Sequence, residues 1–266
     1  MYVPEQGDGV HHSLTKGGAA ILLLLAILPA GCSLDDPKYG PLRASACAPL
    51  EDAISRKLEA SPNATMALYD QVSVEMCRKQ YDLALKDMNE AIAVNPVAYN
   101  YEVRARIHLL QGHDDLAIED FDRAVAIDPN YAPAYLQLAT IYSFAGETES
   151  ASSNLSKALA ADGNDVGVLN GSAWIMATSP DPQLLNGVAA VKYATQACEI
   201  TSWASAPIID TLAAAYARQG KYDEAIKWER EALRILAGRG SASSYKERLA
   251  LYEEGKPYTQ ATWTNS

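Results

Sequence analysis

Apolar and small residues recur at three- and four-residue spacing along residues 99–130, and this pattern predicts two short amphipathic helices. The first helix is expected to end at Gly112 and the second at Pro129, because both residue types interrupt helices. The same pattern returns along the chain: Pro96 and Pro129 are 33 residues apart, and Gly112 and Gly146 are 34 apart. A fixed period of this length predicts a stacked array, since one helical hairpin cannot bury its apolar face alone.

The period divides the chain into five helical hairpins, with a helix on each side of the array. The expected hairpins are 64–97, 98–131, 132–165, 166–204 and 205–237, preceded by a helix within 49–63 and followed by a capping helix over 241–257 and a frayed tail over 258–266. The fourth hairpin is longer than the others, because Ala158 and Ala197 are 39 residues apart where about 34 are expected. The extra residues fall in a loop over 180–187, and loops of this kind often contact partners.

The third hairpin carries the most regular set of residues, and this set resembles the tetratricopeptide repeat (TPR). Its residues of this pattern are Tyr135, Leu138, Ala139, Tyr142, Gly146, Ala151, Leu155 and Ala158. The fifth hairpin repeats much of the pattern, whereas the second departs from it at Arg104 and His108. The resemblance covers about 64–237 and implies an all-α fold, a right-handed superhelix of about five repeats with a C-terminal capping helix.

The resemblance also implies a concave groove lined by the first helix of each repeat, in which family members usually bind other proteins. The positions expected to face this peptide-binding groove are Tyr99, Glu102, Arg106, Leu136, Thr140, Ser143, Asn170, Trp174, Asp210 and Arg218. Trp174 is equally compatible with packing between repeats. The family's Lys and Asn clamp for a C-terminal carboxylate is not reproduced, since Tyr69 and Ser73 stand at its first positions.

Charge and motifs narrow the functional class. The formal net charge of −11 disfavours nucleic acid as a partner. The sequence has no motif of a hydrolase, a nucleotide-binding loop or a zinc enzyme, and no cysteine and histidine spacing typical of a metal site. We therefore expect a protein that is not an enzyme and needs neither cofactor nor metal. His108 is interpreted as a packed core histidine in the place of a tyrosine.

The N-terminal residues 1–31 are typical of a signal peptide, with Lys16 before a short apolar run over 19–28. The residues before Cys32 resemble a bacterial lipobox, apart from Pro29 where leucine is usual. This resemblance implies a lipid-modified Cys32, followed by a flexible tether over 32–48. Secretion with a free cysteine and an uncleaved anchor are the alternatives.

The lipobox implies a protein anchored on the periplasmic side of the cell envelope. The residue after Cys32 is Ser33, whereas an aspartate at this position retains some bacterial lipoproteins at the inner membrane. Ser33 therefore favours the outer membrane in an organism that has one. In such an oxidising compartment Cys47 and Cys77 could form a disulfide, or they could be separate core thiols. Cys198 lies on an apolar helix face and is expected to be buried and inert.

The functional hypothesis is a non-enzymatic scaffold or adaptor lipoprotein that binds a partner protein or peptide in its concave groove. The alternative is a structural or assembly factor, which would bind murein or an envelope machine through its convex face and the loop over 180–187.

Overall fold

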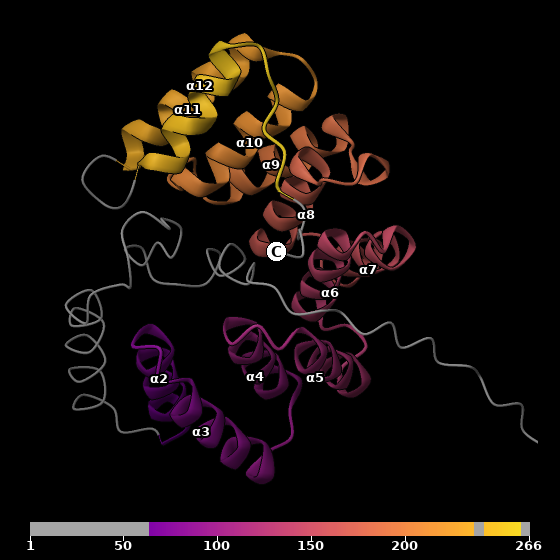
Figure 1. The fold of residues 1–266 in the computed structure, drawn as a ribbon, viewed down its shortest axis with the longest axis vertical. Coiled ribbons are helices and arrows are strands. Elements are labelled where there is room, and N and C mark those ends of the chain that lie inside the picture. Colours follow the sequence, from indigo (N-terminus) through magenta and orange to yellow (C-terminus); the bar gives the residue numbers. More distant parts are fainter. Residues whose placement is uncertain (1–63, 237–241, 262–266) are drawn as a thin grey trace, which may run out of the picture.

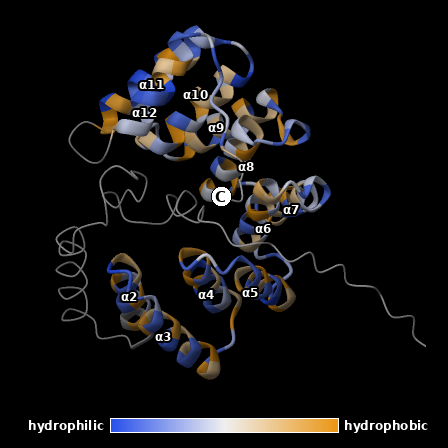
Figure 2. Ribbon diagram, in the orientation of Figure 1, coloured by the Kyte–Doolittle hydropathy of each residue, from blue (hydrophilic) through white to orange (hydrophobic). Residues whose placement is uncertain are grey.

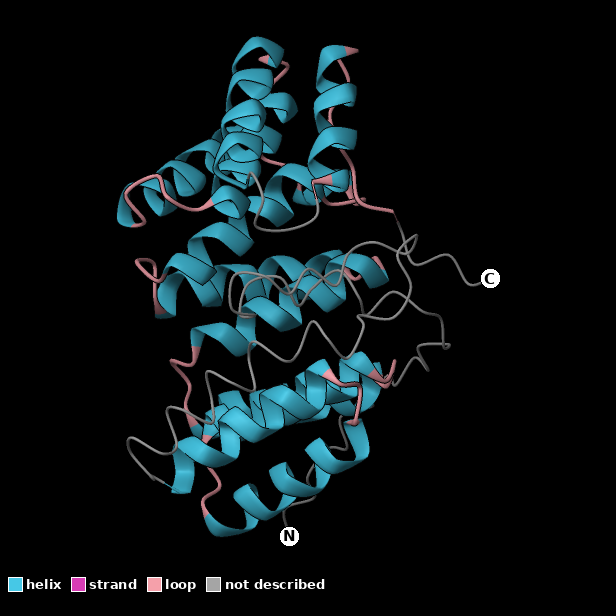
Figure 3. Ribbon diagram, turned by 90° about the vertical axis from the view of Figure 1, so that its left-hand side faces the viewer, coloured by secondary structure: helices cyan, strands magenta, loops and turns pink. Residues whose placement is uncertain are grey.

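The computed structural model describes residues 64–236 and 242–261, and every regular element within them is a helix (Figure 3). The helices are α2 (Ala64–Cys77), α3 (Tyr81–Val94), α4 (Ala98–Leu110), α5 (Asp114–Ile127), α6 (Ala132–Ala145), α7 (Thr148–Ala161), α8 (Val166–Thr178), α9 (Gly187–Ile200), α10 (Ala206–Arg218), α11 (Tyr222–Leu236) and α12 (Ser243–Glu253), with a short 3-10 helix, η2 (Pro182–Leu184). The expected signal peptide, tether and first helix, over 1–63, lie outside the described residues.

Consecutive helices pair into five hairpins, which confirms the predicted all-α solenoid. The pairs are α2 with α3, α4 with α5, α6 with α7, α8 with α9, and α10 with α11. The hairpins stack in chain order from α2 and α3 at one end to α11 and α12 at the other (Figure 1). Towards the C-terminal end the first helices of successive hairpins touch directly, since α6 contacts α8 and α8 contacts α10. None of the described helices is long and apolar enough to cross a membrane.

Each cluster of the hydrophobic core joins one hairpin to the helix or hairpin that follows it in the chain. One cluster, for example, contains Ala117 and Phe121 of α5 together with Leu138 of α6. The alanines that define the period are almost completely buried, and their small side chains let the helices approach closely. The residues of α11 alternate between hydrophilic and hydrophobic, as expected for a helix with one face in solvent (Figure 2).

The turns between paired helices use the left-handed backbone conformation. Gly112, Gly146 and Gly220 have φ values of 74°, 77° and 74°. Glycine adopts this conformation without steric cost, which explains why it recurs at these turns. In the first hairpin the corresponding residue is Lys79, with a φ of 60°. Glycine in the sequence therefore marks three of these left-handed turns, and the turn at Lys79 has no such marker.

The C-terminal residues differ from the prediction of a frayed tail over 258–266. After α12 the chain runs back along α10 and reaches α8 (Figure 1). The main-chain N–H of Gln260 donates to the carbonyl oxygen of Thr178 at the end of α8, over 2.8 Å. Tertiary hydrogen bonds thus hold residues 258–260, hereafter the strap, whereas residues 262–266 lie outside the described part of the chain.

Candidate functional site

The predicted groove begins with two aromatic side chains on α2 and α4. The rings of Tyr69 and Tyr99 meet edge to face, with their centroids 4.9 Å apart. Tyr69 also donates a hydrogen bond of 2.6 Å to the side chain of Asn100, which fixes its orientation. Tyr99 remains 43% exposed, so it offers an immobilised aromatic surface to a partner.

The two charged groove residues predicted on α4 differ: Glu102 is hydrogen-bonded within the chain, and Arg106 is not. Glu102 is only 3% exposed and accepts a hydrogen bond of 2.5 Å from the hydroxyl of Tyr131. Burial raises the pKa of Tyr131, and the neighbouring Glu102 raises it further. Arg106 lies near the same hydroxyl but makes no hydrogen bond or ion pair with the described side chains. This half-buried guanidinium is thus a cation available to a ligand.

The predicted groove residues of α6 are buried, which disfavours direct contact with a partner. Thr140 donates to the carbonyl oxygen of Leu136 within its own helix. Leu136 packs against Gly171 of α8, where an added Cβ would lie 2.6 Å from its side chain. Ser143 forms a hydrogen bond of 2.9 Å with Ser179. These side chains hold α6 against α8 and the residues that follow it.

The two predicted groove residues of α8, Asn170 and Trp174, have different environments. The Oδ1 atom of Asn170 is buried and has no hydrogen-bond partner among the described residues. The ring of Trp174 lies 5.9 Å from that of Tyr258, and the guanidinium of Arg248 lies 5.5 Å from the Trp174 ring. Trp174 is therefore covered by the chain's own C-terminal residues, whereas the Oδ1 atom of Asn170 lacks a hydrogen-bond partner among the described residues.

The two predicted groove residues of α10 are also occupied from within the chain. Asp210 forms a bidentate ion pair with Arg248 of α12, with distances of 2.6 and 2.9 Å. Arg218 donates to the carbonyl oxygens of Ala177 and Tyr258. Burial lowers the pKa of Arg218. The sequence prediction placed Asp210 and Arg218 in an open groove, and the structure instead uses them to bind α12 and the strap.

A polar cluster that the sequence pattern did not predict explains the divergence of the second hairpin. Arg104 donates two hydrogen bonds of 2.7 Å to Asp120 of α5, whose side chain is 3% exposed. His108 lies on the same carboxylate, 3.8 Å away, and burial lowers its pKa. Asp120 is the residue from which this cluster could have been predicted, because an acidic side chain on the packing face of α5 needs a cationic partner. Arg104 therefore replaces an apolar contact by an ionic one, and the His108 ring packs beside the same carboxylate.

The loop over 180–187 is fixed to the array. Thr148 of α7 donates a hydrogen bond to Asp181, which also accepts from the main-chain N–H of Gln183. Leu184 is buried in the core cluster shared by α6, α7 and α8. Asn186 accepts a hydrogen bond from Ala189 and begins α9. The longer connection thus fills space between repeats, which does not favour it as a docking loop.

The described cysteines are a disulfide-bonded Cys77 and a free Cys198. Cys77 is disulfide-bonded, and Cys47 lies outside the described residues, so the pairing of these two stays a prediction. Cys198 is a free, buried thiol, and burial raises its pKa to about 12, as expected for an inert core cysteine. Within residues 64–236 and 242–261 no cluster of His, Cys, Asp and Glu is arranged to hold a metal ion.

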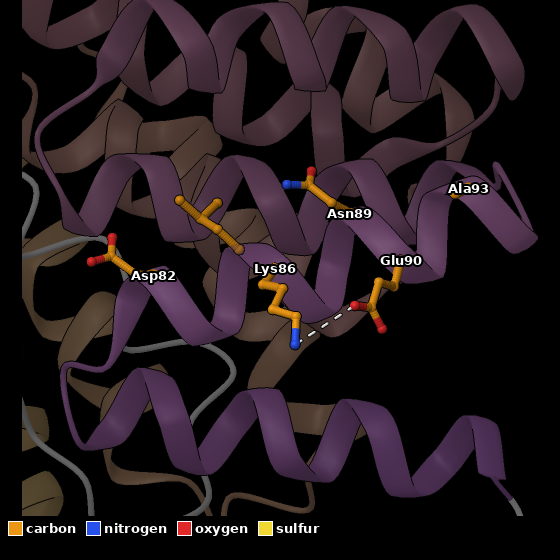
Figure 4. A pocket seen from close by; sticks show the side chains of 6 residues that line it. Asp82, Lys86, Asn89, Glu90 and Ala93 are labelled. Atoms are coloured by element: carbon orange, nitrogen blue, oxygen red, sulfur yellow. Dashed lines mark ion pairs between the residues drawn. The ribbon is translucent and has the colours of Figure 1, made fainter.

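A shallow hollow of about 450 Å³ lies along α3 and is open to solvent (Figure 4). Its described lining includes Leu85, Asn89 and the exposed ion pair of Lys86 with Glu90. Asn89 already accepts a hydrogen bond from Arg104. The hollow brings together no convergent set of polar groups, so it is a weaker candidate than the predicted groove residues Tyr99 and Arg106 of α4.

Comparison with known families explains the repeating hairpins. Three family models, each described as a tetratricopeptide repeat, match residues 53–132, 108–170 and 208–237. The chain is a tetratricopeptide repeat protein. TPR proteins generally act as non-catalytic scaffolds that bind protein partners, and no enzyme family matches the chain. No curated protein matches the sequence.

Solved structures support the same fold. A TPR protein from Thermus thermophilus, TTC0263, superimposes with a TM-score of 0.56 at 21% identity, over 71% of this chain and 98% of that one. A chain of the APC/C hetero-tetramer Cut9-Hcn1 superimposes with a TM-score of 0.59 at 16% identity, over 83% of this chain. This chain spans 43% of the length of that relative. At these identities the likeness establishes the TPR fold alone.

Proposed function

We propose that this TPR protein is a non-enzymatic scaffold that binds an extended segment of a partner protein along α4 and α8. Arg106 carries the proposal, because its half-buried guanidinium makes no hydrogen bond or ion pair with the described side chains and would bind a partner's carboxylate. The exposed ring of Tyr99 on α4 and the unpartnered Oδ1 atom of Asn170 on α8 are further groups that such a segment would contact. Tyrosine and arginine are also the residue types that contribute most to binding energy at interfaces.

Site-specific crosslinking tests this face directly. A photoreactive amino acid replaces Tyr99 on α4 in one variant and Leu116 on α5 in the other, because both native side chains are 43% exposed. In intact cells we expect the variant at position 99 to form one discrete crosslinked product, identified by mass spectrometry. The variant at position 116 serves as the control on a second helix of the array.

Arg106→Glu reverses the charge that the proposal requires, and it should reduce the crosslinked product at position 99 at least tenfold. Equal crosslinking at positions 99 and 116, or a product that Arg106→Glu leaves unchanged, would contradict binding along this face.

We further propose that the scaffold is tethered to the cell envelope through a lipid on Cys32. The support is the apolar run over 19–28 after Lys16, followed by small residues directly before Cys32. A lipidated cysteine would become the mature N-terminus, and the Pro- and Gly-containing residues after it would act as a spacer. The partner would then be a protein with a segment on the same side of the membrane.

Metabolic labelling tests the tether. When cells are grown with radiolabelled palmitate, we expect the wild-type protein to carry the label and to sediment with membranes. Cys32→Ser should abolish the label and release the protein, because the thiol is the attachment atom. Cys198→Ser is the control and should retain the label, since Cys198 is buried in the folded array. A labelled Cys32→Ser protein would exclude this anchor.

A further inference from the structure

The strap lies against Trp174 and Arg218, two of the residues predicted to face the groove, as a bound peptide would. Its Tyr258 ring lies beside Trp174, and the carbonyl oxygen of Tyr258 accepts a hydrogen bond of 2.9 Å from Arg218. The Thr259 hydroxyl accepts a second bond from the same guanidinium, also over 2.9 Å. Main-chain and side-chain atoms of consecutive strap residues are thus recognised one after another.

Gln260 completes the contact at the end of α8. Its main-chain N–H donates to the carbonyl oxygen of Thr178, and its side-chain carbonyl accepts a 3.0 Å hydrogen bond from the Thr178 hydroxyl. Both Gln260 and Thr178 are buried. An aromatic ring, a main-chain carbonyl and a buried amide are the features by which an extended peptide is recognised in a groove.

We propose that the strap is an internal substitute for a ligand, and that the subsite it fills takes a partner's extended peptide with an aromatic residue two positions before a glutamine. This inference rests on the proposed groove function. It adds the residues that the partner's peptide must contain, and it identifies the strap as the segment that the peptide displaces. Trp174, Thr178 and Arg218 form the subsite in both states.

The geometry favours a partner protein over a second copy of this chain. Only four residues separate the end of α12 from Tyr258, so the strap acts at a high effective concentration, on the millimolar scale. An identical strap from another copy gains nothing that offsets this advantage. A partner's peptide that continues towards Asn170 and Arg106 makes additional contacts, and these allow it to displace the strap.

A closed strap lowers the apparent affinity for such a peptide by the fraction of molecules that are open. The probe is a fluorescent synthetic peptide of residues 254–261, measured by fluorescence anisotropy against the full chain. We expect the double variant Tyr258→Ala/Gln260→Ala to bind this peptide at least tenfold more tightly than the wild-type chain does. Adding Trp174→Ala to the double variant should abolish the gain, because the subsite loses its aromatic wall.

Lys256→Ala is the matched control, since Lys256 lies just before the strap and its side chain pairs only with the exposed Glu254 among the described residues. It should bind the peptide as weakly as wild type. The single variant Gln260→Ala keeps the Tyr258 ring and should give a smaller gain, and far-ultraviolet circular dichroism verifies that each variant is folded. A folded double variant with wild-type affinity overturns the proposal, as does wild-type chain that dimerises by exchanging straps.

The peptide assay and the crosslinking assay fail separately. A tenfold gain in peptide affinity supports the strap inference even if crosslinking at position 99 is not selective, which would count against the face along α4. Selective crosslinking at position 99 without any gain in peptide affinity would support the scaffold and refute the strap as a ligand substitute.

Discussion

Replacing Arg248 by leucine is expected to lower the free energy of unfolding by about 3–5 kcal/mol. Arg248 of α12 forms a bidentate ion pair with Asp210 of α10, and both residues are less than 10% exposed. Burial lowers the pKa of Arg248, but the Asp210 carboxylate outweighs that effect, so the pKa is raised and the side chain stays charged. Leucine would leave the Asp210 carboxylate buried without a cation.

Urea unfolding followed by circular dichroism measures the loss. Arg230→Ala is the matched control, because Arg230 of α11 also holds α12 through an ion pair, 2.8 Å long and largely exposed, with Glu253. Exposed pairs contribute about 0–1 kcal/mol, so this control should change stability little. Similar losses for the two variants would contradict the view that burial makes the Arg248 pair important.

Glu229→Gln is expected to make the protein more stable, and increasingly so at higher pH. The Glu229 side chain is 0% exposed and faces Asp210 of α10 and Arg248 and Tyr252 of α12. Burial, reinforced by Asp210, raises the pKa of Glu229 from an ordinary value of 4.5 to about 11. The carboxyl group is therefore protonated at neutral pH, and glutamine reproduces its shape and neutrality.

The direction of the pH dependence follows from the proton on Glu229, which above pH 4.5 is held in the folded state but not in the unfolded state. Glu229 contributes fully to stability below pH 4.5, and this contribution is lost as the pH rises towards 11, by at most about 1.4 kcal/mol per pH unit. Glutamine removes the loss. We expect the stability difference between variant and wild type to grow by at least about 1 kcal/mol between pH 5 and pH 8.

Unfolding in urea at a series of pH values measures this difference. Glu231→Gln, on the same helix, is the control: Glu231 is exposed, and Arg234 lowers rather than raises its pKa. It should not reproduce the growing stabilisation. A Glu229→Gln variant that is less stable than wild type at pH 8 would show that the buried carboxylate is charged in the folded protein.

Most of the array could be predicted from the sequence, because its signals are local and repeated. Gly146 and Gly220 mark turns that need a positive φ, and alanines such as Ala117 and Ala151 mark positions with no room for a larger side chain. The C-terminal capping helix was also predicted. The burial of Arg248 was not, because hydrophobic patterning assigns an arginine to solvent unless its distant partner is known.

The candidate site could be predicted only in part. The repeat register predicts which positions face a groove, and it assigns Tyr99, Arg106 and Asn170 to this set along with residues that the structure shows bound within the chain. It cannot show that Asp210 and Arg218 are bound to α12 and the strap, because those contacts join residues about 40 positions apart in the chain. A short extended segment such as 258–260 also has no periodicity, so the same reasoning predicted it to be frayed.

The strap also changes how the array should respond to stress. In a simple solenoid each repeat contacts only its neighbours, and unfolding can begin at either end. Here the hydrogen bonds of Arg218 and Gln260 tie the strap back to α8. The C-terminal repeats are thereby clasped into one cooperative unit, so amide protons near Thr178 should exchange more slowly than those in the first described hairpin.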